Sequence, residues 1–140
     1  MTPHQIQLVR SSFAQVAPIA DSAAKLFYGR LFELDPTLRP MFKSNMEQQG
    51  NKLMTMIGGA VSLLDQPKKL IPIVQDLGRR HAGYGVDDSN YETVGSALLW
   101  TLEKGLGAAF TPEVEQAWAD VYGLLSVTMR DAANEMFEAA

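Results

Sequence analysis

Apolar residues recur at helical spacing along almost the whole chain, and this periodicity restricts the possible folds more than any other feature. Ile6, Val9, Phe13 and Val16 lie three or four residues apart, so they share one face of a helix. The same spacing returns in the later segments, and we find no run of alternating apolar and polar residues typical of a strand. The sequence therefore predicts an all-α chain that folds as one domain over residues 1–140.

Prolines and capping residues divide this pattern into separate helices. In the first half we expect a helix from the Thr2–Gln5 cap to Pro18, a helix capped at Asp21–Ser22 that ends at Asp35–Pro36, a short turn over 36–42 and a loop over 43–50. A helix that carries Leu53 to Leu64 should follow and stop before Pro67. We then expect a short helix from Pro72 to about His81, a helix capped at Ser89 that ends at Gly105–Gly107, and a last helix that starts at Thr111–Glu113.

Composition excludes several classes of site. The 140 residues contain no cysteine, which removes disulfides, thiolate metal sites, iron–sulfur clusters and a cysteine nucleophile. A formal net charge of −4 without a basic block lacks the electrostatic footprint of a nucleic-acid partner. No apolar run reaches membrane-spanning length, and the first ten residues contain no signal-peptide-like apolar stretch. We therefore expect a soluble cytoplasmic protein with no membrane span.

His81 is unusual because it continues an apolar helical face that also carries Val74 and Leu77. A core histidine that donates a hydrogen bond to a nearby carbonyl explains this placement well. A zinc site requires three or four ligands, and the other histidine, His4, is remote in the sequence. A single imidazole on an apolar wall also suits the axial position of an iron porphyrin, which needs one protein ligand. The residues alone leave these two interpretations open.

Four residues in the first half of the chain also allow two interpretations. Tyr28 lies in an otherwise apolar helical face, where a buried hydroxyl needs a partner. Gln49 and Leu53 lie one helical turn apart, so they face the same side. Phe42 ends the proline-rich segment. Each residue fits ordinary packing, and each also fits the wall of a ligand pocket.

Several stretches, in one order along the chain, resemble the bacterial globins, namely single-domain haemoglobins of the Vitreoscilla type and the haem domain of flavohaemoglobins. These stretches are LFYGRLF, PMF, QQGNKLM, LGRRHAGYGV, NYETVGSALL and AWADVYGLL. The resemblance implies the globin fold, a helical sandwich around haem b (protoporphyrin IX iron). It implies His81 as the proximal iron ligand, with Phe42 packed on the porphyrin. The distal residues that it implies are Tyr28, Gln49 and Leu53, and the further haem contacts are Ile57, Leu77, Tyr84, Val86, Tyr91, Val94 and Leu98.

The resemblance also implies reversible binding of O₂, and of NO and CO, at ferrous iron, with Tyr28 and Gln49 donating hydrogen bonds to O₂. Alternative functions are an NO dioxygenase that converts O₂ and NO to nitrate, and a gas-sensing module. Flavohaemoglobins continue into flavin- and NADH-binding domains, whereas this sequence stops at Ala140 without a dinucleotide-binding glycine motif. We therefore expect any turnover to need an external NAD(P)H-dependent reductase. Phe110, Met136 and Phe137 fit either ordinary core or a dimer contact, so the sequence allows a monomer or a homodimer.

One departure from the family lies in the last helix. The family uses a tyrosine and a glutamate to polarise the axial imidazole. Tyr91 falls on the tyrosine position, but the glutamate position falls on Ala133, with Asp131 and Glu135 two residues to either side. Because two residues rotate by about 200° around a helix, neither acid shares the direction of Ala133. Either the last helix shifts in register or the relay lacks its acid.

Overall fold

The computed structural model describes residues 1–43 and 45–138, with the side chains of 136–138 excepted, and this part of the chain contains helices but no strand. The α-helices are α1 (Pro3–Val16), α2 (Ala20–Leu34), α3 (Met46–Ser62), α4 (Pro67–Gly83), α5 (Asp88–Leu106) and α6 (Pro112–Glu138). Short 3₁₀ helices are η1 (Ala17–Ile19), η2 (Pro36–Met41) and η3 (Gly107–Ala109). The prediction of an all-α chain is confirmed.

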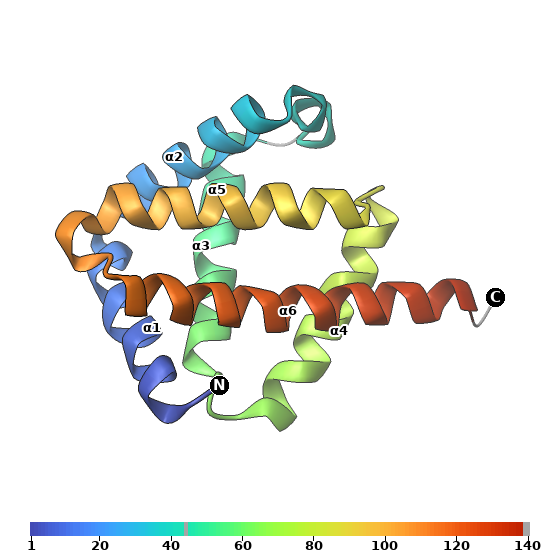
Figure 1. Ribbon diagram of the computed structural model, residues 1–140. Coiled ribbons are helices and arrows are strands. Elements are labelled where there is room, and N and C mark those ends of the chain that lie inside the picture. The colour runs from blue at the N-terminus through green and yellow to red at the C-terminus, as the bar shows by residue number, and fades with distance from the viewer. Residues whose placement is uncertain (44, 139–140) are drawn as a thin grey trace.

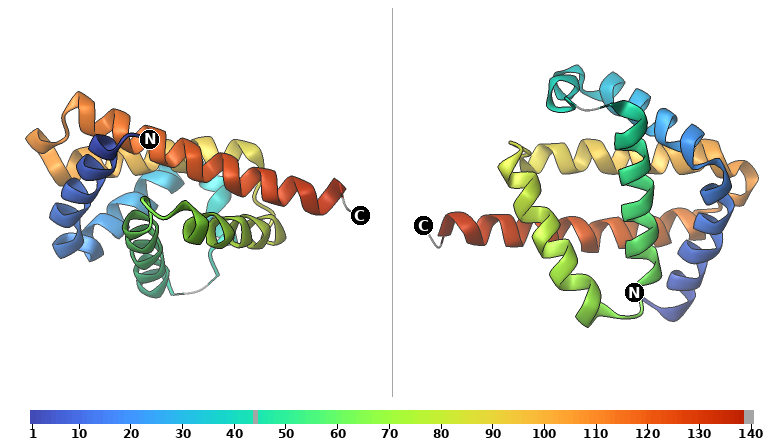
Figure 2. Two further views of the ribbon diagram at one scale, coloured as in Figure 1. Left: turned by 90° about the horizontal axis from the view of Figure 1, so that it is seen from below. Right: turned by 180° about the vertical axis from the view of Figure 1, so that it is seen from behind.

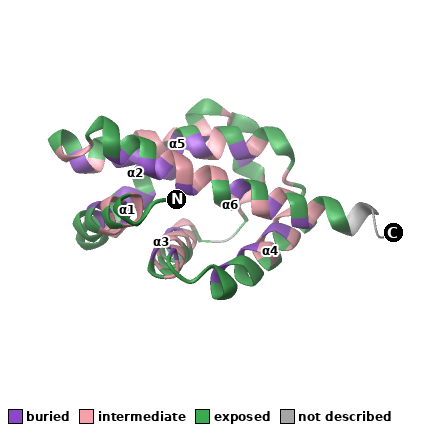
Figure 3. Ribbon diagram, turned by 60° about the horizontal axis from the view of Figure 1, so that its bottom comes forward, coloured by how far each residue is buried: buried purple, intermediate pink, exposed green. Residues whose placement is uncertain are grey.

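The helices form two layers. Figure 3 shows α2, α5 and α6 in one layer and α1, α3 and α4 in the other. The long helices α5 and α6 run side by side in opposite directions (Figure 1). Helix α3 crosses behind them in that view and lies in front of them when the molecule is seen from behind (Figure 2, right). The most extensive packing between layers joins α4 to α6, while α2 packs on both α5 and α3. Residues from both layers can therefore face one shared interior.

Two helices begin with reciprocal capping boxes. At α1 the Thr2 hydroxyl accepts from the Gln5 amide at 3.1 Å, and the Gln5 side chain accepts from the Thr2 amide at 3.1 Å. At α5 the same pair of bonds joins Asp87 and Asn90. The predicted cap at Ser89 is therefore wrong, because the Asp87 carboxylate captures the free amide and Ser89 donates to that carboxylate instead.

Three other predicted boundaries are also wrong. The segment 43–50 is not all loop: α3 begins at Met46, because the Asn45 side chain accepts from the Glu47 and Gln48 amides. The fourth helix begins at Pro67, where a missing N–H costs nothing, and Pro72 lies inside it. The second helix begins at Ala20 directly after η1, so Asp21 lies in its first turn and does not cap it.

The core lies mainly at the end of the molecule where α1, α5 and α6 meet. Trp118 is buried there, and its indole N–H donates to the Ser12 hydroxyl at 2.8 Å. Phe110 packs against this core, whereas Met136 and Phe137 lie among the residues whose side chains are not described. By contrast, the buried residues of α3 and α4 are few, namely Gly50, Val61, Leu70, Val74 and Gly78. Within the described range, none of the helices combines the length and the apolar character needed to cross a membrane.

Candidate functional site

A cavity of about 410 Å³ is lined by residues of α2, η2, α3, α4, α5 and α6. Its volume lies within the range of about 300–1,000 Å³ that is usual for cofactor and small-molecule sites. Most of the lining side chains are apolar. The polar and ionisable side chains on its wall are Tyr28, Gln49, Lys52, His81, Asn90, Tyr91, Tyr122 and Ser126. We call the α4 and α6 side of the cavity (Leu77, His81, Leu125, Met129) the proximal wall, and the α2, η2 and α3 side (Tyr28, Phe42, Gln49, Leu53) the distal wall.

The structure brings together almost all the site residues that the sequence predicts. Those on the cavity wall are Tyr28, Phe42, Gln49, Leu53, Ile57, Leu77, His81, Val86, Tyr91, Val94 and Leu98. Tyr84 does not line the cavity: its side chain is 68% exposed, and its ring centroid lies 6.1 Å from that of His81. The reason is that α4 ends at Gly83 and the chain turns away through Gly85, whose φ of 87° suits glycine.

His81 presents a neutral imidazole on the proximal wall. Its Nδ1 donates to the carbonyl oxygen of Leu77 at 2.8 Å. Because a carbonyl oxygen can only accept, the hydrogen is on Nδ1 and Nε2 holds the lone pair. Burial lowers the pKa of His81 below its usual value, the Leu77 bond opposes this shift, and the nearby Arg80 charge adds to it. At neutral pH the ring is therefore uncharged and has the chemistry of a metal ligand.

The position of the α4 segment that carries His81 depends on a backbone contact between α4 and α6. Gly78 lies one turn before His81 and packs directly against the main chain of Met129. A Cβ atom at position 78 would lie 2.6 Å from the Met129 Cα and would clash with the Met129 carbonyl. Main-chain atoms cannot rotate away from a clash, so only a residue without a Cβ allows the two helices to approach this closely. Gly78 thereby fixes the distance between α4 and α6 beside His81.

The distal wall carries a paired phenol and amide. Tyr28 is 7% exposed, and its hydroxyl oxygen accepts a hydrogen bond from Gln49 Nε2 at 3.3 Å. The Tyr28 ring is held edge-on by Phe27 and Phe42, at centroid distances of 5.0 and 5.3 Å. Burial raises the pKa of Tyr28, and the Gln49 bond only partly offsets this shift. Tyr28 therefore keeps its proton and can donate it in a hydrogen bond to an occupant of the cavity.

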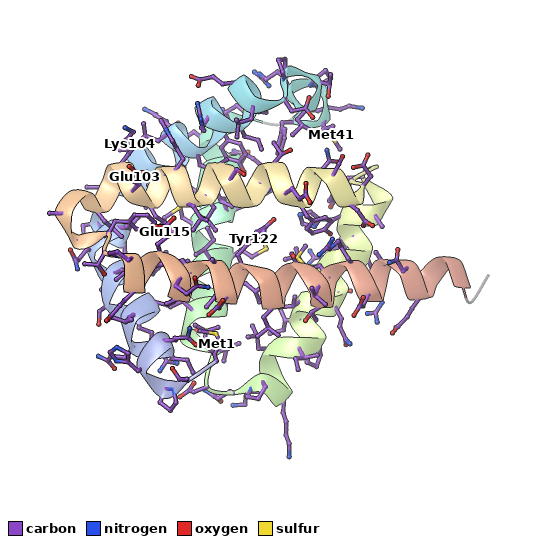
Figure 4. All side chains as sticks on the ribbon, in the orientation of Figure 1. Met1, Met41, Glu103, Lys104, Glu115 and Tyr122 are labelled. Carbon is purple, nitrogen blue, oxygen red and sulfur yellow. The ribbon has the colours of Figure 1, made fainter. Side chains whose placement is uncertain are left out.

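The contributions of α6 and of one lysine to the cavity wall were not predicted from the sequence. Tyr122, Leu125 and Met129 line the cavity at helical spacing, which is the signal that could have identified this face. The side chain of Tyr122 lies between α5 and α6 (Figure 4), and its hydroxyl donates to the Tyr91 carbonyl. Lys52 also lines the cavity, one turn after Gln49, and it supplies a positive charge for an acidic group.

The last helix keeps its register past the position expected for the proximal acid. α6 runs without interruption through Ala133, which is half-buried, while Asp131 and Glu135 are exposed. In the described part of the chain, no hydrogen bond joins His81 to Tyr91. The group over the Tyr91 ring is the Arg130 guanidinium, whose Cζ lies 5.7 Å from the ring centroid. The structure thus places a cation against the ring of Tyr91, while the two acids beside Ala133 are exposed.

The donor set and the walls of this cavity fit the haem that the resemblance implies. An apolar interior suits the porphyrin face, and one neutral imidazole with its lone pair on Nε2 suits axial coordination. Phe42 offers a ring for packing against the macrocycle, and Lys52 offers a counter-charge for its carboxylates. Met56 and Ile73 line the cavity yet are 38% and 53% exposed, which is consistent with apolar edges that a bound group covers.

Comparisons with known proteins identify a family and several relatives of this chain. The family model described as Globin matches residues 25–129. A flavohemoprotein of Xylella fastidiosa (strain 9a5c) is 28% identical over 133 residues, which are 93% of this chain and 33% of the relative. A flavohemoprotein of Bacillus subtilis (strain 168) is 28% identical over 138 residues, which are 96% of this chain and 35% of the relative. The chain therefore spans about a third of the length of these relatives.

Proposed function

Because the chain belongs to the globin family and has haem as its cofactor, we propose that it binds O₂ reversibly, with His81 as the proximal ligand and the Tyr28–Gln49 pair stabilising bound O₂. The family indicates diatomic gases as the ligands, and preference for O₂ is the specific part of the proposal. The single observation that carries the proposal is the pairing of a neutral imidazole on one wall with a protonated phenol on the other.

On the proximal side, His81 would hold the cofactor through Nε2. The Leu77 carbonyl orients the ring through Nδ1, and the Gly78 contact holds the helix that carries it. When bound there, ferrous haem would supply a coordination position for a diatomic gas. The apolar side chains of Phe42, Leu53 and Leu98 exclude water from the space around that position.

On the distal side, the hydroxyl of Tyr28 would select among gases by charge. O₂ gains partial negative charge when it accepts electron density, and CO gains less. A hydrogen bond to a charged group is worth about 1.5–3 kcal/mol, and about 1.4 kcal/mol corresponds to a tenfold change in affinity. Because Gln49 donates to the Tyr28 oxygen, it turns the Tyr28 hydrogen towards a further acceptor. Tyr28 therefore favours O₂ over CO by about tenfold or more.

The proposal is tested on the purified, haem-loaded protein. An intense Soret band is expected, together with a ferrous spectrum of a five-coordinate imidazole complex. Rapid mixing with O₂, CO and NO should then show reversible O₂ binding with slow release. A colourless protein from cells supplied with iron and haem precursor, or rapid irreversible oxidation by O₂, would contradict the proposal.

A second candidate function is oxidation of nitric oxide, in which NO, O₂ and one electron give nitrate. What favours it is the match along nearly the whole chain to proteins named flavohemoproteins, a name that denotes flavin beside haem. The electron would come from an NAD(P)H-dependent flavin reductase. NO consumption that continues for many turnovers with NADH and such a reductase would support this function, and consumption that stops after one turnover would exclude it for that reductase.

A further inference from the structure

Arg130 occupies an unusual place behind the proximal wall. It follows Met129, which lines the cavity, and its Nε donates to the carbonyl oxygen of Ser126, another wall residue, at 3.4 Å. Its guanidinium lies over the ring of Tyr91, and Tyr91 is itself one of the residues that line the cavity. The side chain is half-buried, so its charge is screened less than a surface charge. A guanidinium is positive at every pH at which proteins fold.

The other charges near the proximal wall do not cancel this cation. Arg80 is adjacent to His81, but its Nε lies 3.2 Å from a carboxylate oxygen of Asp76, so the two side chains form an ion pair. Asp88 acts on Tyr91 in the opposite sense, but it is exposed at the start of α5. The bond partner of His81 Nδ1 is a neutral carbonyl and not a carboxylate. With Arg80 paired to Asp76 and Asp88 exposed to solvent, the half-buried guanidinium of Arg130 is the charge that lies directly over Tyr91.

We propose that the positive charge of the Arg130 guanidinium, which lies over Tyr91, raises the reduction potential of the haem and so favours the ferrous state. This inference rests on the proposed function, because it requires haem in the cavity with His81 as its ligand. Reduction adds one electron to the cofactor, so a nearby fixed cation stabilises the reduced form more than the oxidised form. The expected benefit is a larger fraction of protein that can bind gas.

The main test compares the reduction potentials of haem-loaded variants in a spectroelectrochemical titration. Arg130→Gln removes the charge and keeps a polar side chain of similar reach. It should raise the ratio of ferric to ferrous protein at a fixed potential by about three- to tenfold, which is a fall of about 30–60 mV for one electron. Arg130→Lys retains the charge and should stay near the wild-type value. Lys104→Gln removes a cation that lies over Trp100 at the other end of α5, so it serves as the matched control.

A second variant tests the same field without removing Arg130. Ala133 lies three residues after Arg130 on α6, so Ala133→Glu places a carboxylate within reach of the guanidinium. Ala133→Glu should lower the potential in the same direction as Arg130→Gln, and Ala133→Gln should not. Because the family's glutamate falls on position 133, a carboxylate there also acts on the imidazole, so this pair supports the inference only together with removal of the Arg130 charge. Arg130→Met removes the same charge and replaces Arg130→Gln if that variant fails to fold.

The outcomes separate this inference from the proposed function. A wild-type protein without a Soret band would overturn both. A normal Soret band together with wild-type potentials in Arg130→Gln and Ala133→Glu would overturn only the role of Arg130. A ferrous spectrum of Arg130→Gln that has lost the imidazole ligand would also overturn it, because Arg130 would then act on structure. A lower potential with an unchanged ferrous spectrum would support it.

Discussion

The two walls of the cavity are held together by different kinds of contact. On the proximal wall, main chain packs on main chain where Gly78 of α4 contacts Met129 of α6. On the distal wall, side chains pack on side chains: the rings of Phe27, Tyr28 and Phe42 contact one another by their edges. Backbone contacts cannot adjust to a new volume, whereas aromatic side chains can shift by rotation about their side-chain torsions.

This difference suggests a division of labour between the walls. The rigid side holds the one atom whose position matters most, His81 Nε2. The adaptable side surrounds a space that gas must enter and leave. Substitutions on the proximal wall should therefore change cofactor retention and stability, while substitutions on the distal wall should change gas kinetics and leave the cofactor in place.

Replacement of the proximal imidazole tests the comparison most severely. His81→Ala should increase the rate of haem loss by about 100-fold or more, since loss of a mere supporting partner already costs about 10–100-fold in metal affinity. Transfer of haem to an acceptor protein measures this rate. His4→Ala is the control, because His4 is exposed and its Nε2 lies 3.7 Å from a carboxylate oxygen of Glu113. Normal retention in His81→Ala would remove His81 as the ligand.

A methyl group at the helix crossing tests the rigidity of the proximal wall. Gly78→Ala should lower the free energy of unfolding by about 2–3 kcal/mol, because the added Cβ meets main-chain atoms and α4 must move away from α6. Urea unfolding of the variant and the wild type measures the change. Gly83→Ala is the matched control on the same helix, where a Cβ would meet no atom within 4 Å. Equal stability of the two variants would show that the crossing can relax.

Removal of one hydroxyl tests the distal wall. Tyr28→Phe should raise the O₂ dissociation rate by about tenfold, with a much smaller effect on CO and none on haem retention. Flash photolysis or rapid mixing measures both rates. Tyr84→Phe removes a hydroxyl outside the cavity and should change neither. An unchanged O₂ rate in Tyr28→Phe would mean that this hydroxyl does not contact the gas.

The smallest expected effect comes from the partner of that hydroxyl. Gln49→Leu should raise the O₂ dissociation rate by about threefold, because Gln49 orients Tyr28 and a neutral hydrogen bond contributes about 1 kcal/mol. In the double variant with Tyr28→Phe, the two effects should fall short of additive, since the residues form one pair. Additive effects would indicate that Gln49 contacts the gas by itself.

Local patterns were enough to predict the helices but less good at their ends. Competition between neighbouring candidates explains the errors. Pro67 and Pro72 both suit a first turn, and the helix begins at the earlier one although Pro72 then removes one i→i−4 hydrogen bond. Asp87 and Ser89 both have a polar residue three positions later, Asn90 and Glu92, and the structure forms the box between Asp87 and Asn90.

Most of the site residues predicted from the sequence line the cavity, because the resemblance to the globins implied them residue by residue. The position of Tyr84 was not predictable, since the direction in which the chain leaves α4 depends on the turn at Gly85. The wall formed by α6 escaped prediction for a related reason. Apolar spacing identifies a buried face, but it does not say whether that face meets another helix or an open space.

The order of amino acids by itself establishes an all-helical chain with one histidine on an apolar face, because helical periodicity and capping are local properties. Packing between distant segments settles the rest: Gln49 reaches Tyr28, Gly78 meets Met129, and Arg130 lies over Tyr91. These contacts join helices that are far apart in the sequence, so their distances depend on how whole helices cross. The polar pair, the close backbone contact and the position of the Arg130 charge are therefore known only from the tertiary structure.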